Sequence, residues 1–339
     1  MVRYRPPRVS RRCRSGYVLI YIFTYILIMS VHTLKDWVIA TRPWSFPAST
    51  MPVAVTMAYC YYRSSAGMAG PISSDQWIYS ALALLSMILF QAAGNTWSDL
   101  HDFRHGVDTA ADSFSVKILT SGQFSQREIF TLSIVLFGLA SSLGVILALS
   151  CGIEILLLGL AGVALAVLYP FLKYNALGDA DIFMTYALIP TAGVSYLMTG
   201  SYIPEATVLS IPVGLITVAI LHANNTRDVQ TDRQAGIRTL AMIIGNRASR
   251  VLYVAELVVP FVIIGVLIAT GMLPVAACAA CAVAMLPAVR NIRMIARATP
   301  GNHMQICDLD KHTAQLQLIF SMSLCLALSV CAAFISFMA

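Results

Sequence analysis

Long apolar segments recur along the whole chain, and they constrain its fold more than any other feature. Only 11% of the 339 residues are charged, against about 25% in ordinary globular chains. Segments of about twenty apolar residues match the thickness of a bilayer, where each segment must satisfy its own backbone groups. We therefore expect an all-α, polytopic membrane protein. The sequence predicts nine spans, at about 46–62, 77–98, 128–149, 153–171, 180–199, 203–223, 250–270, 273–289 and 313–337.

The loops between these spans predict an orientation in the membrane. Long polar loops alternate with very short ones, so one side carries nearly all the extramembrane residues. Every Lys and Arg except Arg63 falls before the first span or on the long-loop side. By the positive-inside rule, we expect a multi-pass plasma (inner) membrane protein with a cytoplasmic amino terminus. Membrane insertion accounts for this basic excess, which gives no support for nucleic-acid binding.

The amino-terminal segment does not follow the pattern of regular spans. Residues 1–16 are basic, and the apolar stretch Tyr17–Met29 is short for a membrane crossing. It is typical of a signal-like or surface-lying segment, although no small-residue cleavage site follows; alternatively, translation begins at Met29. We predict an extension over 1–33 and a transmembrane domain over 34–339, opening with an amphipathic helix at Leu34–Ser45.

Polar side chains recur at helical spacing where two of the spans end. Asn224, Asp228 and Asp232 repeat every four residues after span 203–223, with Asn225 and Arg227 at the edge of the stripe. Carboxylates at the end of a membrane helix are costly unless they bind something. We therefore interpret this stripe as part of a ligand site facing the cytoplasm.

A similar stripe follows span 77–98. Asn95, Asp99 and Asp102 stand at positions i, i+4 and i+7, and Asp108 lies just beyond them. Four predicted spans separate the two stripes. This repeat suggests two four-helix half-bundles that face each other across one site, plus one further helix.

Carboxylate and amide oxygens suit Mg²⁺, which binds proteins through one or two carboxylates together with phosphate oxygens. Two facing stripes could hold two such ions and clamp a diphosphate. Arg227, Lys173 and Lys117 are candidates to neutralise the charge of that diphosphate, although basic residues also gather at membrane surfaces without any catalytic role.

Other polar residues have simpler explanations. Asp179 and Asp181 begin a span and can complement its helix dipole, and a further role for Asp179 stays open. His101, His105 and His222 lack the spacing of a zinc site and are expected to be polar interface residues. The eight cysteines are scattered through apolar runs and are expected to pack as small hydrophobic residues.

The two stripes resemble the aspartate-rich motifs of the UbiA superfamily of intramembrane prenyltransferases. Four further segments are similar to the branch that prenylates 1,4-dihydroxy-2-naphthoate in menaquinone synthesis, and the similarity covers about residues 34–337. The motifs are Asn95-xxx-Asp99-xx-Asp102-xxxxx-Asp108 and Asn224-Asn225-x-Arg227-Asp228-xxx-Asp232; the segments are Arg42-Pro43-Trp44-Ser45-Phe46, Leu119-Thr120-Ser121-Gly122, Lys173-Tyr174-x-Ala176-Leu177-Gly178-Asp179 and Thr313-Ala314-Gln315-Leu316.

This resemblance implies Mg²⁺-dependent transfer of a polyprenyl chain from its diphosphate to the naphthoate ring, with loss of CO₂, giving demethylmenaquinone. It implies nine helices around a central cavity open to lipid. The magnesium ligands would be Asn95, Asp99, Asp102, Asp228 and Asp232, with Lys173 and Arg227 assisting; the substrate contacts would be Asn224, Asn225, Asp108, Arg42, Lys117 and Tyr169. Whether Asp102 or Asp108 completes the metal set stays open, because the first motif varies in spacing.

Several alternatives stay open at this point. The prenyl acceptor could instead be 4-hydroxybenzoate, haem or a chlorophyll-type alcohol. The short acidic motif of CDP-alcohol phosphotransferases does not occur in this sequence. A secondary transporter with intramembrane carboxylates is a different class, but it would place its acids near the middle of spans rather than at their ends.

Overall fold

The computed structural model describes residues 32–107, 118–297 and 303–338. The chain divides into two compact units, residues 1–43 and 44–339. The helices are α2 (Leu34–Ala40), η2 (Pro43–Ser45), α3 (Pro47–Ser65), α4 (Ser74–Arg104), α5 (Gln126–Cys151), α6 (Ile153–Tyr174), α7 (Gly178–Ile182), η3 (Phe183–Leu188), α8 (Ile189–Thr199), α9 (Pro204–Arg227), α10 (Val229–Gln234), α11 (Leu240–Ala269), η4 (Val275–Ala277), α12 (Cys278–Arg297), η5 (His303–Ile306) and α13 (Leu309–Met338).

The described part of the first unit contains one short helix, α2. Thr33 and Asp36 form a capping box at its start, and the Asp36 carboxylate accepts hydrogen bonds from both the backbone and the hydroxyl of Thr33. The helix ends at Ala40, earlier than the predicted Leu34–Ser45, because Pro43 disfavours a helical Arg42, which has a φ of 55°. The boundary predicted at residue 34 stays a prediction, since residues 1–31 lie outside the described part.

The second unit is a bundle of membrane-spanning helices. In the part of the chain that the structure describes, eight helices are long and apolar enough to cross a bilayer, so this is a multi-pass integral membrane protein. The predicted count of nine is not confirmed. The first predicted span corresponds to α3, which carries several buried hydroxyl side chains and is not among the eight. The cytoplasmic orientation stays a prediction.

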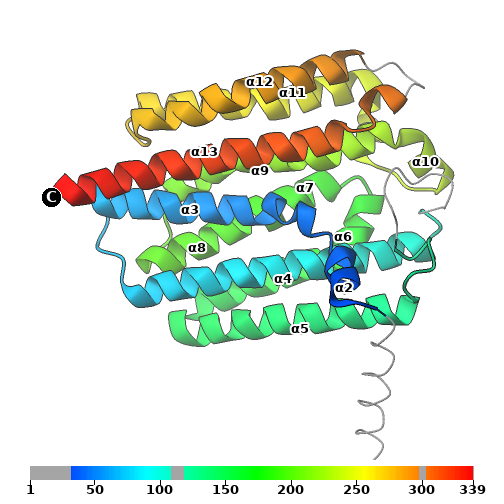
Figure 1. The fold of residues 1–339 in the computed structure, drawn as a ribbon, viewed down its shortest axis with the longest axis horizontal. Helices are drawn as coiled ribbons and strands as arrows, with labels where there is room; N and C mark the ends of the chain where they lie inside the picture. The colour runs from blue at the N-terminus through cyan, green and yellow to red at the C-terminus, as the bar shows by residue number, and fades with distance from the viewer. Residues whose placement is uncertain (1–31, 108–117, 298–302, 339) are drawn as a thin grey trace, which may run out of the picture. The chain divides into compact units, whose positions relative to one another are not determined.

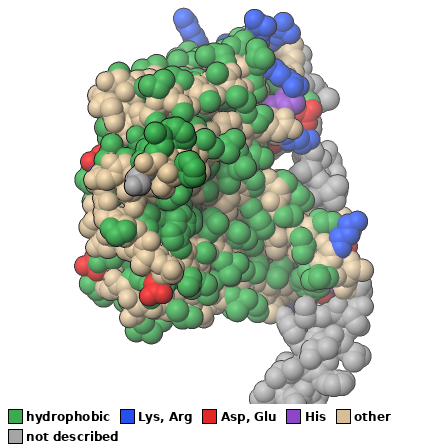
Figure 2. All heavy atoms as spheres, turned by 60° about the vertical axis from the view of Figure 1, so that its left-hand side comes forward, with side chains coloured by type: hydrophobic (Ala, Val, Ile, Leu, Met, Phe, Trp, Pro, Cys, Tyr) green, Lys and Arg blue, Asp and Glu red, His purple; other side chains and the backbone are tan. Residues whose placement is uncertain are grey.

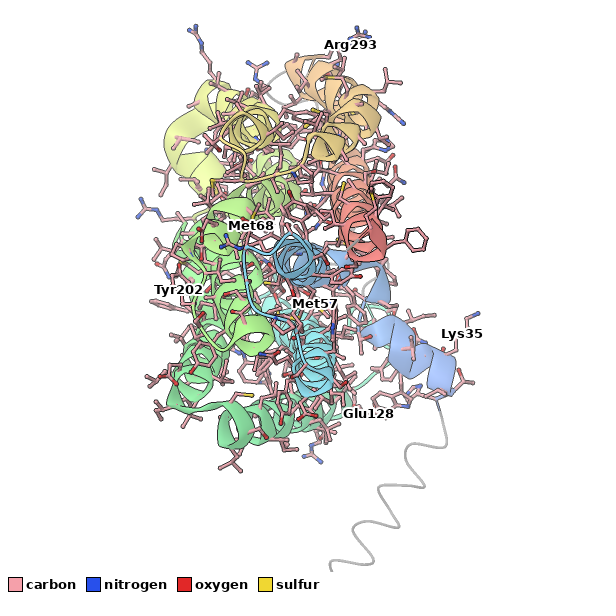
Figure 3. All side chains as sticks on the ribbon, turned by 90° about the vertical axis from the view of Figure 1, so that its left-hand side faces the viewer. Lys35, Met57, Met68, Glu128, Tyr202 and Arg293 are labelled. Carbon is pink, nitrogen blue, oxygen red and sulfur yellow. The ribbon has the colours of Figure 1, made fainter. Side chains whose placement is uncertain are left out.

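The helices pack in two groups joined by α3 and α8. Helices α4, α5 and α6 pack against one another, and α9, α11, α12 and α13 form the second group. α3 packs on α13, α8, α9 and α4, so the first and last long helices lie together in the bundle (Figure 1). Seen along the helix axes, Met68 and Tyr202 mark loops at the near end of this bundle (Figure 3).

Large apolar side chains cover much of the outer surface. They project from α5, α6, α11 and α13 and include Leu139, Leu157, Val262 and Leu326. Figure 2 shows that hydrophobic side chains spread across one face, while Lys and Arg side chains gather at its edge. Such a surface suits contact with lipid chains rather than with water.

A glycine allows close packing between two spans. The span from Gly178 to Thr199 contains a π-helix, η3, two residues before Pro190, whose missing N–H interrupts the regular helical pattern. A Cβ on Gly214 of α9 would lie 2.6 Å from Ala187 Cβ and 2.8 Å from Phe183 Cε2. Only glycine therefore fits where α9 meets η3.

We expect Gly214→Ala to lower the free energy of unfolding by about 1–3 kcal/mol, because the added methyl group overpacks the contact with η3. Gly138→Ala is the matched control: it lies in the exposed middle of α5, and its Cβ would meet nothing within 4 Å. Unfolding in mixed detergent micelles measures both variants. Equal stability of the two would contradict the packing argument.

Candidate active site

The first acidic motif lies at the end of α4, which remains helical as far as Arg104. Asp102 is 4% exposed and is held by two residues from the end of α6. Lys173 Nζ lies 2.9 Å from Asp102 Oδ2 and 3.2 Å from Oδ1, and the Tyr174 hydroxyl donates to Oδ1 at 2.8 Å. The Lys173–Asp102 ion pair therefore joins the ends of two spans.

The other residues of the first motif share the α4 face, as predicted. Asp99 lies one turn before Asp102 and is buried. Asn95 donates from Nδ2 to Ser45 Oγ at 2.9 Å, and Gln91 donates to the Ser45 carbonyl at 3.0 Å. Ser45 thus orients the amide of Asn95. Sequence patterns contain no signal for Ser45 beyond its place in the Arg42–Phe46 segment.

The second acidic motif is organised by the guanidinium of Arg227, which is 9% exposed. Its Nε and Nη2 donate to the two oxygens of Asp228 at 2.7 and 2.8 Å, and Nη2 also donates to Asn224 Oδ1 at 2.8 Å. Its Nη1 lies 3.0 Å from the Cys307 carbonyl and 3.2 Å from Asp310 Oδ2. Arg227 therefore ties α9 to the start of α13, and sequence reasoning had not singled out Asp310.

The predicted continuous stripe over Asn224, Asp228 and Asp232 is wrong in one respect. α9 ends at Arg227, and Asp228 is the residue between α9 and α10. The spacing survives this break, because the Asp228 N–H bonds to the Asn224 carbonyl and the Asp232 N–H bonds to the Asp228 carbonyl. Both aspartates therefore stay near the helix end.

A short backbone contact brings the two halves of the site together. Arg238, in the loop after α10, donates its N–H to the Tyr174 carbonyl at 3.1 Å and forms an isolated bridge with Asn175. Asp232 lies within electrostatic range of Lys173, Asp102 and Asp228. α10 and the end of α4 also lie at the same end of the bundle (Figure 1). The two predicted stripes therefore face one region.

A cluster of buried polar side chains lies next to the second motif. His222 is fully buried; its Nδ1 lies 3.3 Å from Asp179 Oδ2, and its Nε2 lies 3.0 Å from the Ser249 carbonyl. Asn225 donates to Asp179 Oδ1 at 3.3 Å, and Thr226 shares a 2.6 Å hydrogen bond with Ser249. Asn225 therefore contacts Asp179 rather than the Arg227 cluster, and Asp179 does more than complement a helix dipole.

The remaining predicted residues are placed as follows. Tyr169 is half-buried on α6 and lies within electrostatic range of Lys173 and Asp102. Arg42 belongs to the other compact unit. Asp108 and Lys117 lie outside the described residues, so the question of which acid completes the first motif stays open.

The carboxylate and amide oxygens of the site suit Mg²⁺ when phosphate oxygens supply its remaining ligands. Among the described residues, no group of three or more His, Cys, Asp or Glu side chains could hold a metal by itself. Burial raises the pKa of Asp232 to about 7, and no described residue hydrogen-bonds its carboxylate. A cation beside Asp232 would favour its charged form. Mg²⁺ bound through one or two carboxylates and completed by diphosphate oxygens agrees with this arrangement.

We expect Arg227→Met to lower the free energy of unfolding by roughly 2 kcal/mol or more, because Asp228 and Asp310 lose their partner. The control is Arg233→Met on the exposed side of α10, which should change stability by less than about 0.5 kcal/mol. Unfolding in mixed detergent micelles gives both values. A stable Arg227→Met protein would show that the cluster contributes nothing to the fold.

In a comparison with known protein families, residues 64–307 match the UbiA prenyltransferase family. The UbiA prenyltransferase domain-containing protein 1 of Mus musculus is 33% identical over 70% of this chain and 69% of its own length. The homologous protein of Drosophila melanogaster is 33% identical over 67% of this chain and 63% of its own length.

Solved structures share the fold at low sequence identity. A UbiA homologue from Archaeoglobus fulgidus bound to GPP and Mg²⁺ is 14% identical, with a TM-score of 0.53 over 85% of this chain and 98% of that one. The apo structure of a UbiA homologue from Aeropyrum pernix K1 is 13% identical, with a TM-score of 0.57 over 80% of this chain and 96% of that one.

Proposed function

We infer that this chain, which belongs to the UbiA prenyltransferase family and is a prenyltransferase, transfers a polyprenyl group from its diphosphate to 1,4-dihydroxy-2-naphthoate. The convergence of two acidic motifs at one end of the bundle carries the prenyl diphosphate part of this proposal. The proposed acceptor rests on the resemblance of the motif Asn224-Asn225-x-Arg227-Asp228 to the branch that prenylates this naphthoate. In the reaction, the allylic C–O bond to the diphosphate breaks and a ring carbon bonds to the allylic carbon. The ring carboxylate leaves as CO₂, giving the quinol form of demethylmenaquinone.

The residues of the site suit a diphosphate leaving group. We propose that Asn95, Asp99, Asp102, Asp228 and Asp232 hold Mg²⁺, in line with the structures of the Archaeoglobus fulgidus homologue bound to Mg²⁺ with GPP or DMAPP. Bound Mg²⁺ would neutralise the negative charge that develops on the departing diphosphate. Lys173 and Arg227 add positive charge beside the two acidic motifs, and each is held in place by a carboxylate.

The surrounding helices would protect the reaction from water. An allylic cation is trapped by water unless the cavity is dry, and the lipid-facing spans provide an apolar setting for the prenyl chain. We propose that the polyprenyl donor enters from membrane lipid, and that the charged ends of the spans face the cytoplasm of a plasma (inner) membrane. Asn224, Asp108, Arg42, Lys117 and Tyr169 stay proposed as substrate contacts. The sequence predicts Asn225 as one too, but its amide donates to Asp179, so we propose that it positions Asp179 instead.

The experiment uses the purified full chain in detergent with a long polyprenyl diphosphate, 1,4-dihydroxy-2-naphthoate and either Mg²⁺ or EDTA. Chromatography of the lipid extract follows the prenylated quinone. We expect product only with Mg²⁺, and we expect Asp228→Asn to reduce kcat by at least about 100-fold, because the Mg²⁺ that would balance the charge of the departing diphosphate loses a carboxylate ligand.

Asp75→Asn is the matched control, since Asp75 is an exposed acid at the opposite end of α4. It should retain the activity of the wild-type chain. Product with 4-hydroxybenzoate or haem, but not with the naphthoate, would keep the site and replace the proposed acceptor. No transfer to any acceptor would contradict prenyl transfer by this chain and favour a transport role for the carboxylates.

A further inference from the structure

The exposed side of α12 changes from apolar to basic along a single stripe. Val283 and Leu286 are 55% and 80% exposed, and Arg290, Arg293 and Arg297 continue the same three-and-four spacing towards the end of the helix. The opposite side is buried in the bundle through small residues such as Ala284 and Ala288. The stripe therefore faces outward along its whole length.

The dimensions of this stripe match the boundary of a bilayer. At a rise of about 1.5 Å per residue, the three arginines span about 10 Å along the axis, directly beyond the exposed apolar residues. That distance is comparable to the headgroup layer beyond the hydrocarbon core. The apolar part of the stripe thus suits lipid chains, and the basic part suits the layer of phosphate groups above them.

The arginines line a surface pocket of about 520 Å³ together with Met294 and Gln305. None of the three forms an ion pair with a carboxylate of the described residues. Arg290 Nη2 lies within hydrogen-bond distance, 3.0 Å, of His312 Nε2 on α13. This contact positions the guanidinium without neutralising its charge. Figure 3 shows Arg293 at the outer rim of the bundle.

We propose that this pocket binds the headgroup of an anionic phospholipid, with Arg290, Arg293 and Arg297 contacting its phosphate and Val283 and Leu286 lying along its acyl chains. Guanidinium groups bind phosphate oxygens in pairs of hydrogen bonds, and basic pockets between membrane helices suit anionic headgroups. Ordinary positive-inside placement requires basic residues on this side, but not three of them around one pocket without a carboxylate. None of the residues that line the pocket belongs to the acidic motifs, and the proposal does not depend on the proposed reaction.

The test compares binding of phosphatidylglycerol and phosphatidylcholine to the detergent-purified full chain by native mass spectrometry. We expect tighter binding of phosphatidylglycerol, weakened by added salt. Arg293→Gln with Arg297→Gln should reduce that affinity roughly 25- to 30-fold, since each arginine near an anionic headgroup contributes about a factor of five.

The matched control is Arg127→Gln with Arg247→Gln, which removes two exposed charges from the starts of α5 and α11. It should keep the preference for phosphatidylglycerol, and circular dichroism should show that both double variants keep their helices. Equal loss in the control would overturn the proposal, because general surface charge would then explain binding. Displacement of the lipid by millimolar inorganic phosphate, or much stronger binding of a prenyl diphosphate to the same arginines, would overturn it as well.

Discussion

The ion pair between Lys173 and Asp102 is the contact on which the arrangement of the site depends. A carboxylate at the end of a membrane span loses its hydration, and that loss is tolerated only when a cation and hydrogen bonds replace water. Here the cation comes from a different span, so charge compensation also fixes α6 against α4. Tyr174 adds a hydrogen bond to the same carboxylate, and its carbonyl accepts from Arg238 beyond the second motif. One buried charge thereby sets the positions of three segments far apart in the sequence.

The aspartates in the two halves of the site are paired with cations from different places in the chain. In the first half the compensating lysine comes from another helix, whereas in the second Arg227 stands next to Asp228 in sequence. Arg227 also binds Asp310 and the carbonyl of Cys307, which brings the start of α13 to the site. The sequence repeat therefore does not imply identical structures. The second motif relies on the last span, and the buried contact of His222 with Asp179 supports it from α7.

The charged residues of this protein serve different purposes at one end of the bundle. Those of the acidic motifs are paired or partly buried and converge on one region, as a site for a metal and a phosphorylated substrate requires. The arginines of α12 are exposed, lack carboxylate partners among the described residues and stand beyond a lipid-facing strip. Burial and pairing thus separate residues suited to chemistry from residues suited to the membrane surface.

The sequence by itself determined the all-helical membrane fold, most of the spans and the two acidic motifs, because bilayer thickness and helical periodicity act locally along a chain. It also indicated Lys173 and Arg227 as cations of the site. The tertiary structure decided how these groups pair. Asp310, Ser45 and the Asp179–His222 contact could not be found by spacing, since each joins residues distant in sequence. The break between α9 and α10 was equally hidden, because Asp228 preserves the four-residue repeat while its backbone leaves the helix. Compensation of buried charge depends on which helices become neighbours, and only packing decides that.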